Sequence, residues 1–213
     1  MSEAPLPASL PLFPLTGALL LPGARLPLNI FEPRYLAMTR AALGEARLIG
    51  MIQPLDGKGD AGDPPLHRIG CAGKIVEFRE TEDGRFLIAL AGLSRFAVTA
   101  ETVTADLYRR ADVDWSQFHG DLAESEIGEF DRARLLKSLG PFFTRHGVKA
   151  ELGAASAMPA LRLVNALAMM APFAPREKQA LLESEPVERA RLLIQLIEMS
   201  LLGGEIQGAG APN

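Results

Sequence analysis

The sequence predicts an α+β fold in which strands come first and helices follow. Between Gly73 and Trp115, apolar and polar residues alternate in several short stretches, which is typical of strands with one buried face. After Trp115 the apolar residues recur at helical spacing. Strand and helix patterns that occupy separate parts of a chain favour an α+β fold over a parallel α/β sheet.

The opening stretch, Leu10–Tyr35, sets five prolines among leucine, phenylalanine and isoleucine. Proline fixes φ and removes a backbone donor, so an uninterrupted helix is excluded here. Pro33 suits the first turn of a helix, which Gly44 is placed to end. The strands expected before that helix are Leu10–Phe13, Ala18–Leu21 and Leu26–Ile30.

The middle of the chain predicts the rest of a sheet. Val76 and Phe78 alternate with charged residues, and Asp83-Gly84 gives a tight turn, so we expect a β-hairpin with one buried face. The stretch 55–67 is rich in Gly, Asp and Pro and predicts an exposed loop. The remaining expected strands are Arg47–Ile52, Arg95–Glu101 and Tyr108–Trp115.

Four helical segments are expected afterwards. The first, Leu122–Phe143, should break at Gly140-Pro141. The second has Ser156 as a candidate cap, the third spans Pro175–Glu183, and the last follows Ser184. The apolar face of the last helix should comprise Ala190, Leu193, Ile194, Ile197 and Leu201. The expected division is therefore a β subdomain at 1–118, a helical subdomain at 119–203 and a flexible tail at 204–213.

Composition narrows the function classes. The chain has 213 residues, and its net charge of −4 gives no basic bias of the kind that phosphate binding needs. Cys71 is the single cysteine, which excludes an intrachain disulfide and a cysteine-rich metal site. No Lys or Arg precedes Arg25, and the apolar runs are too short for a membrane helix. We therefore expect a soluble, cytoplasmic protein.

Three stretches resemble one family in the same order. They are LPLFPL with LPLNIFEPRY, then GCAGKIVEF with LAGLSRFAV, then PREKQALLESEPVERARLLIQLIEMSL. Over residues 10–202 the chain is similar to the amino-terminal, substrate-binding domain of Lon proteases, above all to stand-alone bacterial proteins made of it. It also resembles the Lon-like part of cereblon. The resemblance implies a PUA-like six-stranded pseudo-β-barrel followed by a carboxy-terminal α-helical lobe.

Catalytic and metal-site motifs are not recognisable in the sequence. Gly73-Lys74 resembles the end of a phosphate-binding loop, but Arg68 stands where the first glycine belongs, and Ile75 replaces the Ser/Thr. His67, His119 and His146 lack metal-site spacing. We expect no metal, no cofactor and no ATPase or protease activity in this chain alone.

The resemblance implies binding of unfolded or extended polypeptides, with a separate protease as a further partner. Whether the protein forms homo-oligomers is left open by the sequence. Two alternatives remain: a PUA-like RNA-binding protein, or a small-molecule enzyme with a site near Glu32, Arg34 and Arg95. A polar cluster of Glu32, Arg34, Tyr35 and Arg95 is expected to be structural. The candidate polypeptide-binding residues are Leu12, Phe13, Leu28, Ile30, Phe31 and Phe78.

Overall fold

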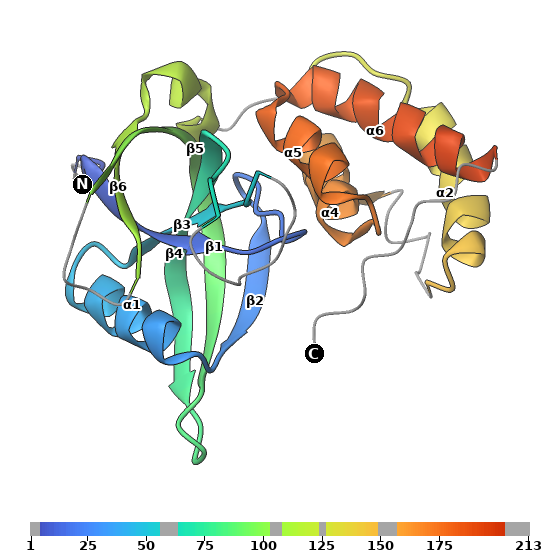
Figure 1. Ribbon diagram of the computed structural model, residues 1–213. Coiled ribbons are helices and arrows are strands. Elements are labelled where there is room, and N and C mark those ends of the chain that lie inside the picture. Colours follow the sequence, from blue (N-terminus) through green and yellow to red (C-terminus); the bar gives the residue numbers. More distant parts are fainter. Residues whose placement is uncertain (1–4, 56–63, 103–107, 124–126, 149–156, 203–213) are drawn as a thin grey trace. The chain divides into compact units, whose positions relative to one another are not determined.

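The computed structural model describes residues 5–55, 64–102, 108–123, 127–148 and 157–202 (Figure 1). The chain divides into two units, which we call the barrel unit (1–16 and 20–123) and the helical unit (17–19 and 124–213). The division falls after Ala123, later than the expected boundary at 118, because the short helix η1 (Ser116–Leu122) packs against β5 of the barrel unit. The expected tail lies outside the described residues.

The barrel unit is built on one six-stranded sheet with the order β2-β5-β4-β3-β1-β6 (Figure 1). β6 also pairs with β5, so five strands close into a barrel and β2 pairs on β5 outside that closure. β1 and β3 are parallel, and the other pairs are antiparallel. The strands are β1 (Ser9–Pro14), β2 (Arg25–Ile30), β3 (Leu48–Ile52), β4 (Ile69–Glu80), β5 (Phe86–Thr102) and β6 (Arg110–Asp114).

The Phe96 ring is fully buried in the barrel interior, and glycines make room for it. A Cβ built on Gly50 or Gly70 would lie 2.9 or 2.5 Å from that ring, which is closer than carbon atoms pack. The Trp115 ring lies 6.0 Å from the Phe96 ring, edge-on. The interior cluster comprises Leu10, Leu12, Leu48, Ile52, Ala72, Phe96, Ala111 and Val113.

Helix α1 (Pro33–Gly44) forms as predicted, with Tyr35, Met38 and Ala42 buried. The Tyr35 ring lies 4.3 Å from that of Phe13 in β1. Further along the helix, the Arg40 guanidinium lies 4.8 Å above the Phe86 ring. Because side chains alternate along a strand, α1 lies on the face of β5 opposite to Leu87.

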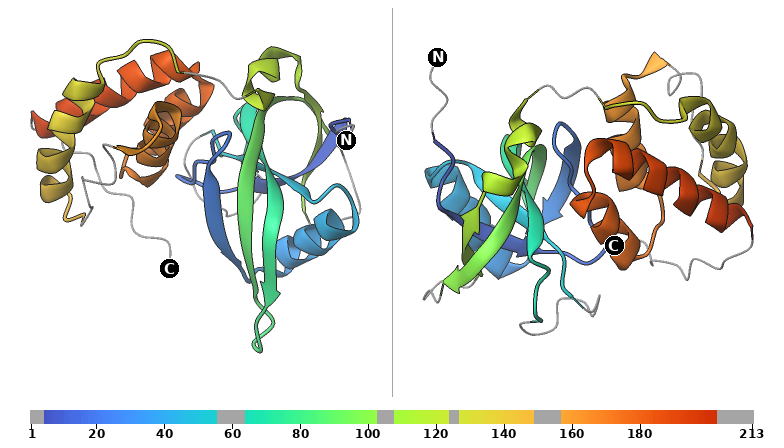
Figure 2. Two further views of the ribbon diagram at one scale, coloured as in Figure 1. Left: turned by 180° about the vertical axis from the view of Figure 1, so that it is seen from behind. Right: turned by 90° about the horizontal axis from the view of Figure 1, so that it is seen from above.

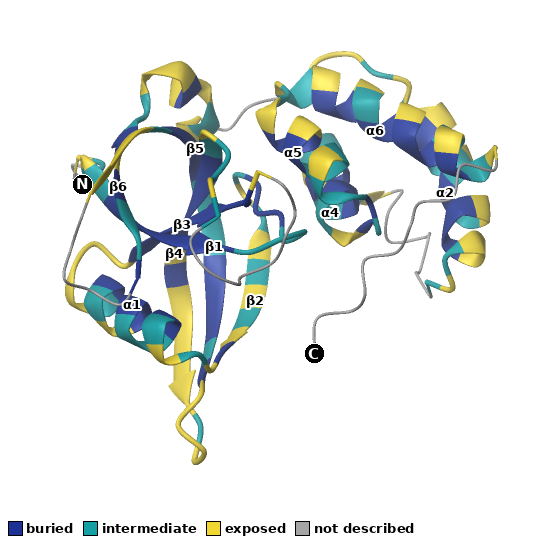
Figure 3. Ribbon diagram, viewed as in Figure 1, coloured by how far each residue is buried: buried dark blue, intermediate teal, exposed yellow. Residues whose placement is uncertain are grey.

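The β4–β5 hairpin turns at Asp83-Gly84 as predicted, with Gly84 at φ +78°. Its tip extends beyond the rest of the barrel unit in Figure 1 and in the left view of Figure 2. The expected burial of Val76 and Phe78 was wrong, because both are exposed, at 44% and 39%. Over this stretch of the described chain β4 pairs with no strand except β5, and Figure 3 shows this part of β4 as mostly exposed.

Two strand predictions also differ from the structure. β5 (Phe86–Thr102) runs unbroken from the return of the hairpin through the region where a separate strand was expected at Arg95–Glu101. The stretch 18–21 is not a strand, although Leu19, Leu20 and Leu21 are buried. A buried apolar segment need not form a strand when its backbone groups make hydrogen bonds outside a sheet. Here the Ala24 amide donates to the Leu21 carbonyl at 3.1 Å.

The helical unit contains α2 (Arg132–Arg145), α4 (Ala160–Met170), α5 (Pro175–Glu183) and α6 (Pro186–Leu201). The predicted break at Gly140-Pro141 was wrong, because α2 continues through it and buries Phe142 and Phe143 beyond. The predicted face of α6 is confirmed, with Leu201 only partly buried. Ser156, the expected cap of α4, lies outside the described residues.

Buried Arg189 ties three helices of this unit together. Its guanidinium donates to the Leu181 and Ser184 carbonyls at 2.8 and 2.9 Å and to the Asn165 amide oxygen at 2.8 Å.

Burial lowers the pKa of the Lys178 ammonium in α5 below its usual value. Among the described residues, no helix is both long and apolar enough to cross a membrane.

Candidate functional site

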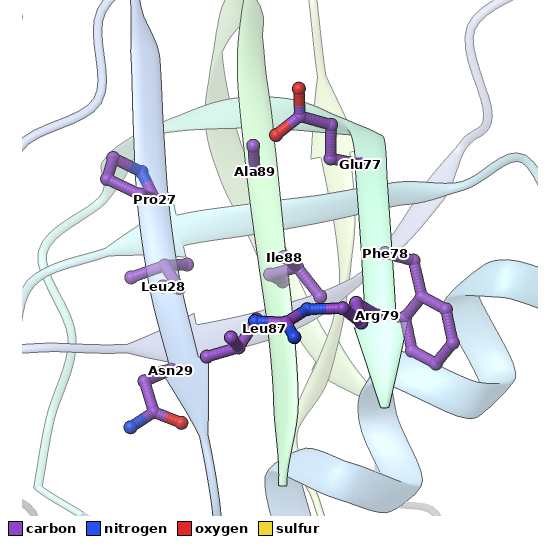
Figure 4. A pocket seen from close by; sticks show the side chains of 9 residues that line it. All are labelled: Pro27, Leu28, Asn29, Glu77, Phe78, Arg79, Leu87, Ile88 and Ala89. Atoms are coloured by element: carbon purple, nitrogen blue, oxygen red, sulfur yellow. The ribbon is translucent and has the colours of Figure 1, made fainter. Parts of the chain in front are cut away.

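A groove of about 620 Å³ lies on the β2, β5 and β4 strands of the barrel unit, beyond the closed part of the barrel. Figure 4 shows its lining side chains, which come from all three strands. Its position on the β4–β5 hairpin places it where β4 is exposed. The lining residues are Pro27, Leu28, Asn29, Glu77, Phe78, Arg79, Leu87, Ile88 and Ala89.

The strand register assigns these side chains to two faces. Residues directly opposite one another on neighbouring strands point to the same side, and the side alternates along each strand. Leu87 therefore shares a face with Asn29 and Arg79, whereas Phe86 points toward α1. We call the face of Leu87 the outer face. Its three rows are Lys74–Ala91–Arg25, Glu77–Ala89–Pro27 and Arg79–Leu87–Asn29.

Small and apolar residues of β5 form the floor of the outer face, and charged residues stand at its sides. The Arg25 guanidinium reaches the Glu77 carboxylate at 2.7 Å, and both side chains are more than half exposed. In Figure 4 the Arg79 side chain extends from β4 across β5 toward β2. Neither Arg79 nor Lys74 forms an ion pair within the described part of the chain.

Exposed aromatic rings lie next to the groove. Phe31 follows β2 directly and is 53% exposed, with the Arg85 guanidinium 5.6 Å above its ring. The Phe78 ring meets the Phe86 ring edge-on at 5.0 Å, and Figure 4 shows it directed away from Arg79. Aromatic and apolar surface is thus available on both sides of this part of the sheet.

The candidate polypeptide-binding residues separate into two groups. Leu12, Phe13 and Ile30 are buried in the barrel unit and contribute packing. Leu28, Phe31 and Phe78 reach the surface, and Leu28 and Phe78 line the groove. The register pairs both Leu28 and Phe78 with Ile88, so these two side chains point to the face opposite to the outer face. None of the six candidates lies in the outer-face rows.

The expected polar cluster divides into two separate networks. Arg34 pairs with Glu32 at 3.0 Å and lies over the Tyr35 ring at 4.5 Å. Arg95 is buried elsewhere, where its guanidinium and its backbone amide donate to the Asp121 carboxylate at 2.9 Å. The structure therefore does not bring Arg95 to Glu32 and Arg34.

Sequence reasoning missed the outer-face residues Glu77, Arg79, Leu87 and Ala89. The sequence did contain a signal for them. Glu77 and Arg79 are the polar residues of the alternation in β4, and Ala89 is a small residue in β5. That alternation shows which side chains share a face. It does not show which of the two faces another element covers.

Comparison with known proteins identifies the family of the chain. The family model for the ATP-dependent protease La (Lon) substrate-binding domain matches residues 9–199. The chain belongs to this family. The fold, a six-stranded sheet of which five strands close into a barrel, followed by helices, is shared with solved Lon N-terminal domains.

Curated relatives are full Lon proteases. The Lon protease of Flavobacterium johnsoniae is 26% identical over 129 residues, which cover 60% of this chain and 16% of that protein. Lon protease 4 of Sorangium cellulosum is 33% identical over 129 residues, which cover 59% and 15%. The Lon protease of Syntrophus aciditrophicus is 22% identical over 204 residues, or 92% and 22%. The chain therefore spans a small part of the length of the relatives it matches.

Two solved structures share the fold. The Lon N-terminal domain protein from Xanthomonas campestris has a TM-score of 0.59 and 26% identity, covering 89% of this chain and 97% of that one. The N-terminal domain of the Mycobacterium avium complex Lon protease has a TM-score of 0.64 and 19% identity, covering 89% and 98%. The second likeness concerns the fold alone.

Proposed function

We propose that this protein binds unfolded or extended polypeptide segments in the groove of the β2, β5 and β4 strands, without chemical catalysis. The observation that carries the proposal is a groove with a floor of Leu87 and Ala89 on the exposed part of a Lon substrate-binding fold. An extended chain presents alternate side chains to such a surface and contacts it without any covalent step.

The strand that borders the groove is compatible with this role. β2 is paired with β5 alone among the described strands, and it carries Pro27 at its centre. Proline on an edge strand removes a backbone donor and discourages a further strand from pairing there. We therefore place the bound segment over the outer face of the sheet and not on the edge of β2.

The cellular role proposed with this is that of an adaptor in the cytoplasm that captures unfolded segments for a separate protease. The support is that the curated relatives carry the same region within named proteases. Binding by the outer face can be tested without that protease, because every residue of the groove lies in this chain.

The direct test is fluorescence anisotropy with a labelled, end-capped extended peptide, Ser-Gln-Thr-Leu-Thr-Gln-Ser. We expect saturable binding, and Leu87→Gln should weaken it roughly three- to tenfold because about 1 kcal/mol of apolar contact is lost. Leu55→Gln is the matched control, since Leu55 is 50% exposed in the barrel unit and is not among the residues that line the groove. Absence of saturable binding, or equal losses in the two variants, would contradict the proposal.

A further inference from the structure

We propose that the outer face selects extended segments in which an apolar side chain is flanked on both sides by acidic side chains, in the order acidic–x–apolar–x–acidic. This inference rests on the proposed function and specifies its substrate class. It follows from the charge and spacing of the three outer-face rows.

The outer face is basic in a chain that is acidic overall. It carries Arg25, Lys74 and Arg79 against one carboxylate, that of Glu77, whereas the whole chain has a net charge of −4. Glu77 is paired with Arg25 at 2.7 Å. The cations that remain open to a ligand are therefore Lys74 in the first row and Arg79 in the third.

The rows set the spacing of the ligand. From Ala91 to Leu87 the central strand advances four residues, which is about 13 Å at the usual rise per residue. A bound extended chain has the same rise, so side chains two residues on either side of its central one reach the outer rows. An acidic side chain there meets Lys74 or Arg79, and guanidinium groups hold carboxylates with paired hydrogen bonds.

The central row sets the middle residue. Ala89 leaves room above β5, and Pro27 adds apolar surface beside it. Glu77 in the same row disfavours a third acidic side chain at the centre, because like charges at close range repel. An apolar side chain above Ala89 is thus the complement of this row.

The same features disfavour RNA as the occupant. Single-stranded nucleic acid is held by aromatic rings that stack on its bases, and the outer-face rows contain none. The Glu77 carboxylate also lies between Lys74 and Arg79, where a phosphate backbone would pass. A segment with separated negative charges avoids that repulsion.

The test compares three labelled, end-capped peptides by anisotropy: Ser-Glu-Thr-Leu-Thr-Glu-Ser, its Gln counterpart and its Lys counterpart. We expect the Glu peptide to bind roughly three- to tenfold more tightly than the Gln peptide, and the Lys peptide to bind most weakly. The preference should shrink on raising NaCl from roughly 0.1 to about 1 M, where exposed charges are screened.

Charge-reversal variants test which residue of the protein recognises the acidic side chains of the peptide. Arg79→Glu should remove the preference for the Glu peptide, leave the Gln peptide unchanged and strengthen the Lys peptide roughly threefold. Arg162→Glu, at an exposed position of α4, makes the same change of net charge and should leave the order of the three peptides intact.

The outcomes distinguish acidic selectivity from polypeptide binding itself. Equal binding of all three peptides would overturn the acidic selectivity and leave polypeptide binding standing. Binding of none would overturn the proposed function itself. Tighter binding of a labelled single-stranded RNA than of the Glu peptide, abolished by Arg79→Glu, would overturn the peptide as occupant in favour of nucleic acid.

Discussion

The β4–β5 ribbon lies in two environments along its length. Around Gly70 and Phe96 it is part of the closed barrel, and its side chains are buried between strands. Around Phe78 and Leu87 the same strands have only β2 as a further strand partner within the described chain, and charged side chains stand on their surface. One continuous ribbon thus supplies both the core and the groove.

Each environment carries an ion pair, and the two pairs differ in solvent exposure. In the closed part, the side chains of Arg95 and Asp121 are 1% and 7% exposed. At the open part, those of Arg25 and Glu77 are 59% and 67% exposed. Removing one partner of a buried pair leaves an uncompensated charge away from water, whereas water solvates an exposed one. The difference indicates that the ion pair of the closed part contributes more to stability than the exposed pair of the open part.

The largest effect is expected from Asp121→Ala. This change removes the carboxylate that accepts from the backbone amide and the guanidinium of buried Arg95. The free energy of unfolding should fall by about 3–5 kcal/mol, measured by urea denaturation. A loss below about 1 kcal/mol would show that the closed part does not depend on this pair.

A smaller loss is expected from Gly70→Ala. The added Cβ would lie 2.6 Å from the Met51 carbonyl oxygen, and backbone cannot move aside as a flexible side chain can. We expect a loss of about 1–3 kcal/mol in the free energy of unfolding, which thermal and urea denaturation would both register. Gly120→Ala is the control, because a Cβ there meets no atom within 4 Å. Similar losses in the two variants would refute a steric cause.

The sequence predicts the closed part well because its physical signals are local. Proline and glycine fix where α1 begins and ends, and Tyr35 and Met38 mark its buried face. The family resemblance predicts the number of strands and their closure into a barrel. The spacing of apolar residues alone does not predict either. Pro141 shows a limit of such signals: it removes one helical hydrogen bond, yet the buried Phe142 and Phe143 keep that segment helical.

The groove is harder to predict because exposure is a property of the assembled sheet. Val76 and Phe78 have the alternation of a buried face and are nonetheless exposed. Whether a strand face is covered depends on α1 and β3, which are far away in sequence from the hairpin. Arg79 and Leu87 become neighbours only through the β4–β5 register, so the outer face appears once that pairing is known.

The smallest effect on stability is expected from Glu77→Ala, the open counterpart of Asp121→Ala. The exposed pair with Arg25 should contribute about 0.2–1 kcal/mol to the free energy of unfolding. Binding should change more than folding, because the variant frees Arg25 and removes the one carboxylate from the three outer-face rows. We therefore expect the Glu peptide to bind more tightly, by roughly two- to fivefold in anisotropy at low salt. If Glu77→Ala instead lowers the free energy of unfolding as much as Asp121→Ala does, the open part also contributes strongly to stability. Stability and binding would then not be separated along this ribbon.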